Sequence, residues 1–198
     1  MLTAGVDEVG RGCLAGEVVS AAVILPNNHG ILGLNDSKKL REHQREAICS
    51  EIVEKCICFS IGKAYVCEID RLNILQATML SMQRAVSGLK VEPEFVLVDG
   101  NKLPEWKYKS KAIVKGDSLI EEISAASILA KVTRDKDMHS LDTLFPGYGF
   151  SKNKGYGTPQ HLEALDRNGV TVSHRKTFSP IRELVYDRQE KLLSLIHI

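Results

Sequence analysis

Acidic side chains follow three stretches of this sequence that have the length and composition of buried β-strands. Asp7 and Glu8 follow the first stretch, Asp99 the second and Asp117 the third. In α/β sheets, functional side chains collect at the carboxyl ends of the strands. If these strands are neighbours, the four carboxylates form one cluster, which protons or cations must neutralise. Oxygen ligands without cysteine or histidine favour Mg²⁺ or Mn²⁺.

Each acidic residue also has a simpler interpretation. Asp7 and Glu8 could form an ordinary acidic strand end, followed by a tight turn at Gly10 and Gly12. Asp117 could serve only as the cap or first-turn acid of the helix after it. Recurrence at three strand ends favours the cluster. Carboxylates that hold two ions about 4 Å apart are the ligand set of phosphodiester hydrolysis.

The composition is that of a globular protein and restricts the kinds of site. The chain has 198 residues, of which 43% are hydrophobic. That is enough for one sizeable core. No apolar run reaches about 18 residues and the first residues lack a signal-peptide pattern, so we expect a cytoplasmic protein without a membrane span. The five cysteines lack zinc-site spacing, and we expect free thiols.

The net charge of +1 conceals two basic segments. Residues 147–182 hold six basic side chains against two acidic ones, and residues 101–117 hold five lysines against two acidic residues. Basic flanks around an acidic centre suit an enzyme that holds cations and a polyanion together. An ordinary solvated face is the commoner explanation of any single charge run.

Hydrophobic periodicity predicts the elements that must position the carboxylates. Strand patterns cover residues 2–7, 18–25, 57–66, 95–98 and 111–114. Helical patterns cover residues 41–55, 74–89, 118–144 and 158–168, with a last helix from about residue 180. This order predicts one α/β domain over residues 1–198. Its mixed sheet is followed by a helical C-terminal part from about residue 147.

Six motifs together resemble ribonuclease HII, the type 2 ribonuclease H family. They occur in the family's order over nearly the whole chain, at Asp7–Gly12, Asp36–Leu40, Val98–Gly100, Lys115–Asp117, Ser124–Asp135 and Lys154–Thr158. The resemblance implies a ribonuclease H-like fold, in which helices flank a mixed five-stranded sheet. It also implies a small helical C-terminal part that binds substrate.

The resemblance implies an endoribonuclease that hydrolyses the RNA strand of RNA–DNA hybrids. It also implies cleavage 5′ of ribonucleotides embedded in duplex DNA, with Mg²⁺ or Mn²⁺ in a two-metal mechanism that leaves 3′-hydroxyl and 5′-phosphate ends. Primer removal and ribonucleotide excision repair are the implied roles. A lone small catalytic domain is expected to be a monomer.

The resemblance assigns catalysis and metal binding to Asp7, Glu8, Asp99 and Asp117. It implies that the backbone of the glycine turn reads the 2′-hydroxyl, which separates RNA from DNA. It further implies that a tyrosine packs on the sugar past the cut. We expect phosphate contacts from several other side chains, because phosphates dominate affinity. The expected substrate-binding residues are Gly10, Arg11, Gly12, Tyr156, Ser37, Lys38, Lys39, Lys154 and Arg175.

Two residues depart from the family pattern. Cys13 stands where proline is usual, and Glu17 where proline is frequent. Neither replaces a predicted ligand. The charge of Glu17 near the glycine turn predicts weaker substrate binding there.

Other polar residues have less specific predicted roles. Asp135 is expected in a structural ion pair, and Lys131 is expected to neutralise the acidic centre. His161 and His174 could touch phosphate or could have surface or capping roles.

Two other functions remain as alternatives at this point. A strand-end aspartate before a glycine-rich turn also suits nucleotide phosphate binding in actin- and sugar-kinase-like folds. Residues 5–12, however, contain neither a P-loop nor the Rossmann glycine spacing. A module that binds hybrid duplexes without cutting them is expected to have lost a carboxylate, and all four are present.

Overall fold

The computed structural model describes residues 1–34, 37 and 40–186. Its centre is a five-stranded sheet in the order β3-β2-β1-β4-β5. The strands are β1 (Thr3–Val9), β2 (Val18–Ile24), β3 (Cys58–Ala64), β4 (Phe95–Asp99) and β5 (Ser110–Ile113). The β1–β2 and β2–β3 pairs are antiparallel, whereas β4 is parallel to both β1 and β5. The predicted mixed five-stranded sheet is therefore confirmed.

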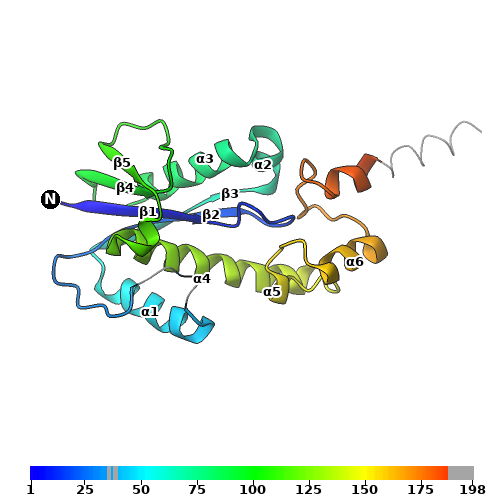
Figure 1. Cartoon of the computed structure of the whole chain (residues 1–198), viewed down its shortest axis with the longest axis horizontal. Helices are drawn as coiled ribbons and strands as arrows, with labels where there is room; N and C mark the ends of the chain where they lie inside the picture. The colour runs from blue at the N-terminus through cyan, green and yellow to red at the C-terminus, as the bar shows by residue number, and fades with distance from the viewer. Residues whose placement is uncertain (35–36, 38–39, 187–198) are drawn as a thin grey trace, which may run out of the picture.

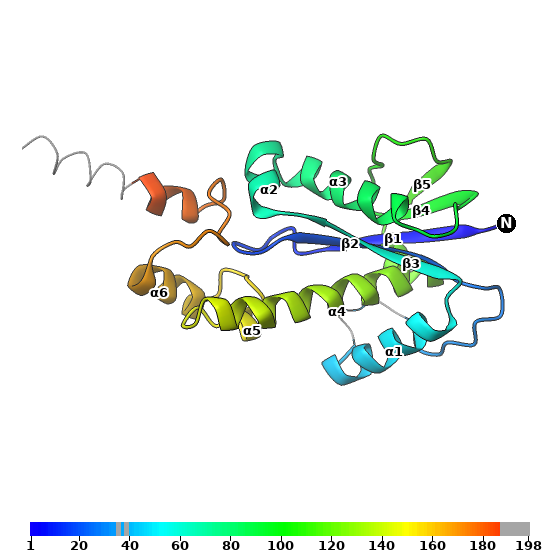
Figure 2. The same ribbon diagram turned by 180° about the vertical axis from the view of Figure 1, so that it is seen from behind.

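Helices cover both faces of this sheet. The helices are α1 (Glu42–Lys55), α2 (Val66–Leu72), α3 (Ile74–Ser87), α4 (Glu121–Leu144), α5 (Phe150–Asn153) and α6 (Pro159–Asn168), and residues 181–186 are also helical. Helices α2 and α3 lie on one face and α4 on the other, with α1 packed outside α4 (Figures 1 and 2). None of the helices in the described ranges is long and apolar enough to cross a membrane.

Strand β2 is buried along its whole length because both of its faces are covered. Ala21 and Val23 pack in the cluster that includes residues of α4, whereas Ala22 and Ile24 pack in the cluster that includes residues of α3. This alternation is the two-residue period of a β-strand. The sheet therefore separates two hydrophobic layers.

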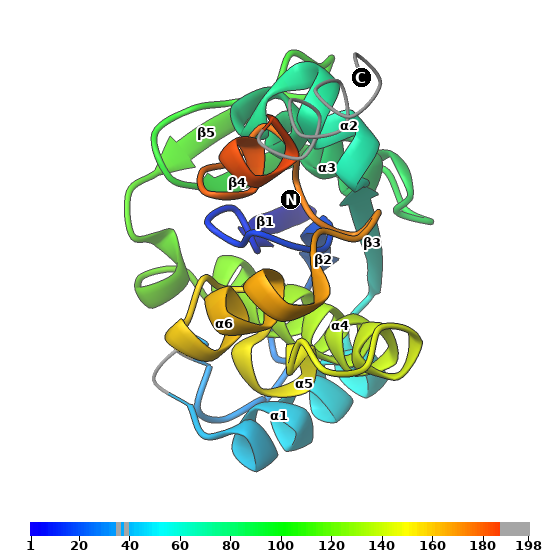
Figure 3. The same cartoon turned by 90° about the vertical axis from the view of Figure 1, so that its right-hand side faces the viewer.

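The C-terminal part packs against the loop that follows β1. The backbone N–H of Leu14 donates to Gly155, and that of Arg175 donates to Leu14, each over 2.8 Å. Gly16 N–H also donates to the carbonyl of Ser173 over 2.9 Å. Figure 3 looks onto this end of the sheet, where α5, α6 and the residues after them lie in front. Segments more than a hundred positions apart therefore meet beside the end of β1.

The structure differs from the sequence prediction in three places. The strand predicted to reach residue 66 ends at Ala64, and the short helix α2 follows at once. Helix α5 was also not predicted. The long helix begins at Glu121 rather than 118, because residues 116–118 form a 3₁₀ turn, η1 (Gly116–Ser118), after Lys115 in the left-handed conformation.

Candidate active site

The pairing of β1 with β4 aligns two of the predicted carboxylates. Val6 lies opposite Val98 in the parallel register, so Asp7 and Asp99 follow at neighbouring positions. Gly5 lets α4 lie directly on β1, because a β-carbon there would overlap the backbone of Glu122. The sheet and α4 therefore converge at the end of β1.

All four predicted carboxylates line one pocket of about 390 Å³, as do Tyr156 and Lys131. The carboxylates are Asp7, Glu8, Asp99 and Asp117. They come from the ends of β1 and β4 and from η1, which follows β5. The structure thus brings these side chains together, as the strand-end pattern predicted. Their roles as metal ligands and catalysts stay predictions.

The pocket disfavours negative charge. Burial, followed by the charges of Glu8 and Asp99, raises the pKa of Asp7 well above its usual value. Burial is also the main cause that raises the pKa of Glu8 and of Asp99. Glu8 Oε2 is buried and has no hydrogen-bond partner in the described part of the chain. A proton or a cation is therefore needed to stabilise this group of carboxylates.

The donor set fits a hard divalent cation, because the acidic side chains lining the pocket offer only oxygen ligands. Within residues 1–34, 37 and 40–186, no three acidic, histidine or cysteine side chains are close enough to hold one ion as they now point. Asp99 Oδ1 accepts from the Gly116 N–H over 2.7 Å, and Glu8 Oε1 accepts from Arg11 over 3.2 Å. Binding an ion would require these side chains to reorient.

Two buried hydroxyl groups, those of Ser127 and Ser37, follow one another next to Asp7. Ser127 on α4 hydrogen-bonds Asp7, and its hydroxyl lies 2.9 Å from that of Ser37. Ser37 is only 4% exposed but lines the same pocket as the four carboxylates, and its phosphate contact stays a prediction. Lys38 and Lys39 lie outside the described residues.

Ser127 was not predicted as a site residue, although it belongs to the motif of residues 124–135. Its signal is periodicity: Ser124, Ser127 and Lys131 recur at three- and four-residue spacing, which places them along one helix face. Only the packing of α4 on β1 shows that this face meets Asp7.

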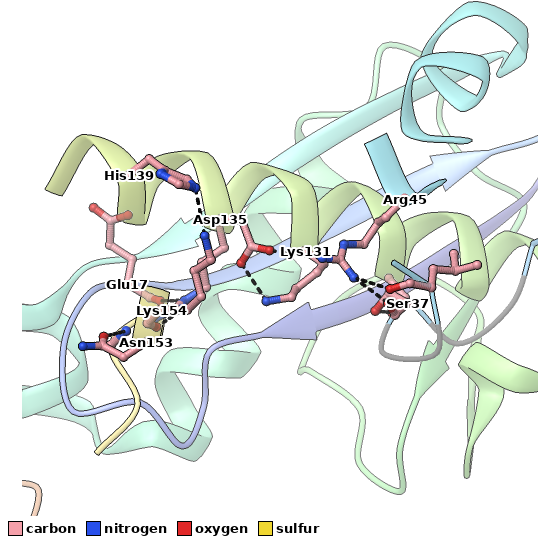
Figure 4. Close-up of polar contacts among 12 residues, drawn as sticks. Glu17, Ser37, Arg45, Lys131, Asp135, His139, Asn153 and Lys154 are labelled. Atoms are coloured by element: carbon pink, nitrogen blue, oxygen red, sulfur yellow. Dashed lines mark hydrogen bonds and ion pairs between the residues drawn. The ribbon is translucent and has the colours of Figure 1, made fainter. Parts of the chain in front are cut away.

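An ion-pair network extends from the pocket to α1 (Figure 4). Lys131 Nζ lies 2.6 Å from Asp135 Oδ1, and Asp135 Oδ2 lies 3.5 Å from Arg45. The Arg45 guanidinium also donates to the carbonyls of Ser37 and Leu40, over 2.8 and 3.0 Å. The structural ion pair predicted for Asp135 is confirmed. The network ties residues 37 and 40 to α4.

Arg175 has a different position from the one predicted. Its guanidinium is fully buried, and it donates to the carbonyls of Gly10, Arg11 and Gly16 over 2.6, 2.8 and 2.9 Å. Burial lowers the pKa of Arg175 to about 10. The predicted phosphate contact is therefore wrong: Arg175 holds the glycine turn from inside the protein. In the described chain, the N–H groups of Arg11 and Gly12 have no acceptor.

Tyr156 is 44% exposed and lies beside the glycine turn. Its ring would be 4.0 Å from a β-carbon placed on Gly12. Burial, followed by the neighbouring Cys13 thiol, raises the pKa of Tyr156. Cys13 is fully buried, so the residue that replaces proline acts on Tyr156 from inside the protein.

Lys154 and Glu17 lie along α4 on the far side of Asp135 from Lys131 (Figure 4). The Lys154 ammonium is 2.9 Å from the ring of His139 on α4, and its phosphate contact stays a prediction. Glu17 lines a different pocket from the four carboxylates, and Lys63 lies 3.9 Å from it. Lys63 is closer to Asp137, at 2.6 Å, so it balances the charge of Glu17 only in part, and the weaker substrate binding expected from Glu17 stays a prediction.

A mixed five-stranded sheet with carboxylates gathered at the ends of its central strands defines a ribonuclease H-like protein. Solved structures share the fold over most of the chain. Ribonuclease H2 from Pyrococcus horikoshii has a TM-score of 0.78 at 26% identity, covering 93% of this chain and 97% of that one. Ribonuclease HII from Archaeoglobus fulgidus, solved in complex with PCNA, has a TM-score of 0.72 at 26% identity, covering 90% and 96%.

The sequence comparisons narrow this class to one family. Residues 4–180 match the ribonuclease HII family. A ribonuclease HII from Shewanella oneidensis is 58% identical over 189 residues, which are 93% of this chain and 90% of the relative. The chain therefore belongs to the ribonuclease HII family and is a ribonuclease H endonuclease that acts on RNA–DNA hybrids. The kinase-like and non-cutting alternatives are wrong.

Proposed function

We propose that this enzyme cuts on the 5′ side of ribonucleotides, both in RNA–DNA hybrids and where a ribonucleotide is embedded in duplex DNA. The pocket that Asp7, Glu8, Asp99 and Asp117 share carries the proposal. In it, the pKa of Asp7 is raised by burial and by its acidic neighbours, and Glu8 Oε2 is buried without a partner in the described residues. Mg²⁺ or Mn²⁺ bound there would compensate both.

Two bound ions would activate water and stabilise the departing 3′-oxygen, which gives 3′-hydroxyl and 5′-phosphate products. The contribution of the protein is to hold the four carboxylates in one pocket, in position for the ions. Ser127 orients Asp7 through a hydrogen bond, and the N–H of Gly116 orients Asp99. Lys131 also lines the pocket, with its ammonium paired with Asp135.

Selection of ribonucleotides is assigned to the backbone of Gly10, Arg11 and Gly12. Arg175 binds the Gly10 and Arg11 carbonyls on the protein side. The N–H groups of Arg11 and Gly12 have no acceptor in the described residues and are available to a 2′-hydroxyl. Because the Tyr156 ring lies next to Gly12, it is placed to pack on the following sugar.

The biological roles in this proposal follow from the substrates. Cleavage beside ribonucleotides suits removal of RNA primers and of ribonucleotides misincorporated into DNA. We further propose that the enzyme acts in the cytoplasm as a monomer. Its partners are the RNA–DNA hybrid and the DNA duplex containing ribonucleotides, with phosphates held by lysines such as Lys154.

The test is cleavage of a DNA duplex that carries one labelled ribonucleotide, in Mg²⁺, Mn²⁺ or EDTA, beside an all-DNA duplex and a full RNA–DNA hybrid. We expect one cut 5′ of the ribonucleotide with either metal and none in EDTA or in the all-DNA control. Asp99→Asn should fold normally and lose at least about a hundredfold in rate, as when a group that stabilises the transition state is removed. Normal turnover by this variant would overturn the metal-binding assignment, and cleavage of hybrids alone would overturn the single-ribonucleotide assignment.

A further inference from the structure

Two buried histidines lie behind Tyr156. His161 is on α6 and His174 is in the segment after it, and both side chains are fully buried. Their Nε2 atoms are 3.1 Å apart. Because both rings are fully buried, neither can touch phosphate or have the surface role that was an alternative for it.

Hydrogen-bond partners determine which nitrogen of each ring carries the proton. The backbone N–H of Thr171 can only donate, and it lies 3.0 Å from His174 Nδ1. Neutral His174 must therefore carry its proton on Nε2 and donate it to His161 Nε2. His161 then carries its proton on Nδ1 and donates it to the Tyr156 carbonyl over 2.9 Å.

The surroundings keep this pair neutral. The stacked rings of Tyr148 and Phe150 pack against both histidines, with ring centroids 5.2 to 6.4 Å away. Burial lowers the pKa of both histidines, that of His174 to about 4, with the neighbouring His161 as the next cause. Both ring nitrogens of each neutral histidine are satisfied, which makes the pair a rigid connection.

Arg175, the residue after His174, supports the glycine turn, which is the other element that faces substrate in the proposed function. Arg175 donates to the carbonyls of Gly10 and Arg11, while His174 reaches the Tyr156 carbonyl through His161. Two adjacent residues thus place the tyrosine and the glycine turn relative to each other.

We propose that His161 and His174 are positioning residues that determine specificity: through the Tyr156 backbone they hold the tyrosine ring at a fixed place beside the glycine turn. This inference rests on the proposed function, in which Tyr156 packs on the sugar past the cut. A fixed ring discriminates between a deoxyribose and a ribose at that position, whereas a ring free to shift does so less well.

The test compares cleavage of the single-ribonucleotide duplex with cleavage of the uniform RNA–DNA hybrid, as the ratio of the two kcat/KM values. His161→Phe keeps an aromatic ring but removes the imidazole donor to the Tyr156 carbonyl, which then keeps only the Thr158 N–H, and it should reduce this ratio about fivefold, as expected for one lost neutral hydrogen bond. His161→Asn offers an amide donor near the position of Nδ1 and should restore most of the ratio. Tyr156→Ala should reduce the ratio at least as much as His161→Phe.

The outcomes separate the inference from the function on which it rests. A reduced ratio for Tyr156→Ala with an unchanged ratio for well-folded His161→Phe overturns the role of the histidines and leaves the proposed function intact. An unchanged ratio for Tyr156→Ala overturns the tyrosine's proposed function and, with it, this inference. Nitrogen-15 NMR of the imidazoles provides a readout that is independent of activity. We expect protons on Nδ1 of His161 and Nε2 of His174, and the opposite tautomers would overturn the arrangement even if the enzyme cut nothing.

Discussion

Arg175 Nη2 donates to the carbonyl of Gly10 over 2.6 Å, across 165 positions of the chain. The same guanidinium binds the carbonyls of Arg11 and Gly16, and its side chain is fully buried. Arg175 was expected to face the substrate. It instead supports the glycine turn from inside the protein.

Arg175→Lys tests this support. Lysine retains the charge but cannot reach three carbonyls in one plane, because it lacks the fork of the guanidinium. We expect kcat/KM on the single-ribonucleotide duplex to fall about tenfold or more, with a lower melting temperature. Lys176→Ala is the matched control, because Lys176 is adjacent but exposed, and its rate should stay within about twofold. A rate for Arg175→Lys within about twofold of the wild type, like that of the control, would contradict the support role of the guanidinium.

Asp7→Asn tests the electrostatic cost of the carboxylate pocket. The raised pKa of Asp7 means that the folded state holds its proton more readily than the unfolded state does. The stabilisation from that proton is complete below the ordinary pKa of about 4 and is lost as the pH rises through the folded value. In EDTA at neutral pH, Asp7→Asn should therefore be more stable than the wild-type protein.

Urea unfolding in EDTA at several pH values measures this difference. It should shrink toward pH 4, and it should amount to about 1.4 kcal/mol for each unit by which the pKa of Asp7 is raised. Added Mg²⁺ should stabilise the wild-type protein more than the variant. A variant that is less stable than the wild type in EDTA at pH 7 would contradict this interpretation.

Ser127→Ala tests the hydroxyl that hydrogen-bonds Asp7. This bond lowers the pKa of Asp7 and so opposes the effects of burial and neighbouring charge. Without it, Asp7 should hold its proton more tightly, and the Mg²⁺ concentration for half-maximal cleavage should rise about fivefold. Saturating metal should restore most of the rate. A lower maximal rate with an unchanged metal requirement would place Ser127 in catalysis rather than in orienting Asp7.

His174→Phe tests the buried histidine pair through pH. Burial lowers the folded pKa of His174 from 6.5 to about 4, so the unfolded chain takes up a proton there more readily than the folded protein. The stabilisation is complete above about pH 6.5 and is lost as the pH falls toward 4. Phenylalanine does not titrate and lacks this dependence.

The measurement is the free energy of unfolding at pH 7 and pH 5. Between these values the wild-type protein should lose more stability than His174→Phe, because the carboxylates titrate alike in both. Identical losses would mean that His174 is as easily protonated in the folded protein as in the unfolded chain.

Local patterns predicted the elements that carry the carboxylates. The three- and four-residue spacing of apolar residues between 74 and 89 became α3, and the short apolar run at 95–98 became β4. Such signals are local, because each helix or strand needs one apolar face. The short helices α2 and α5 were missed because a few residues carry too little periodicity to be distinguished from loops.

The sequence by itself determined the family, the sheet and the four acidic residues at the strand ends, because these signals lie within short continuous segments. The roles of Arg175 and the histidine pair were decided only by the tertiary structure. A polar side chain looks the same in the sequence whether it faces substrate or buried carbonyls. Its role depends on partners such as Gly10 and Tyr156, which the fold brings to it from distant segments. Once the side chain is buried, its polar groups must find hydrogen-bond partners there.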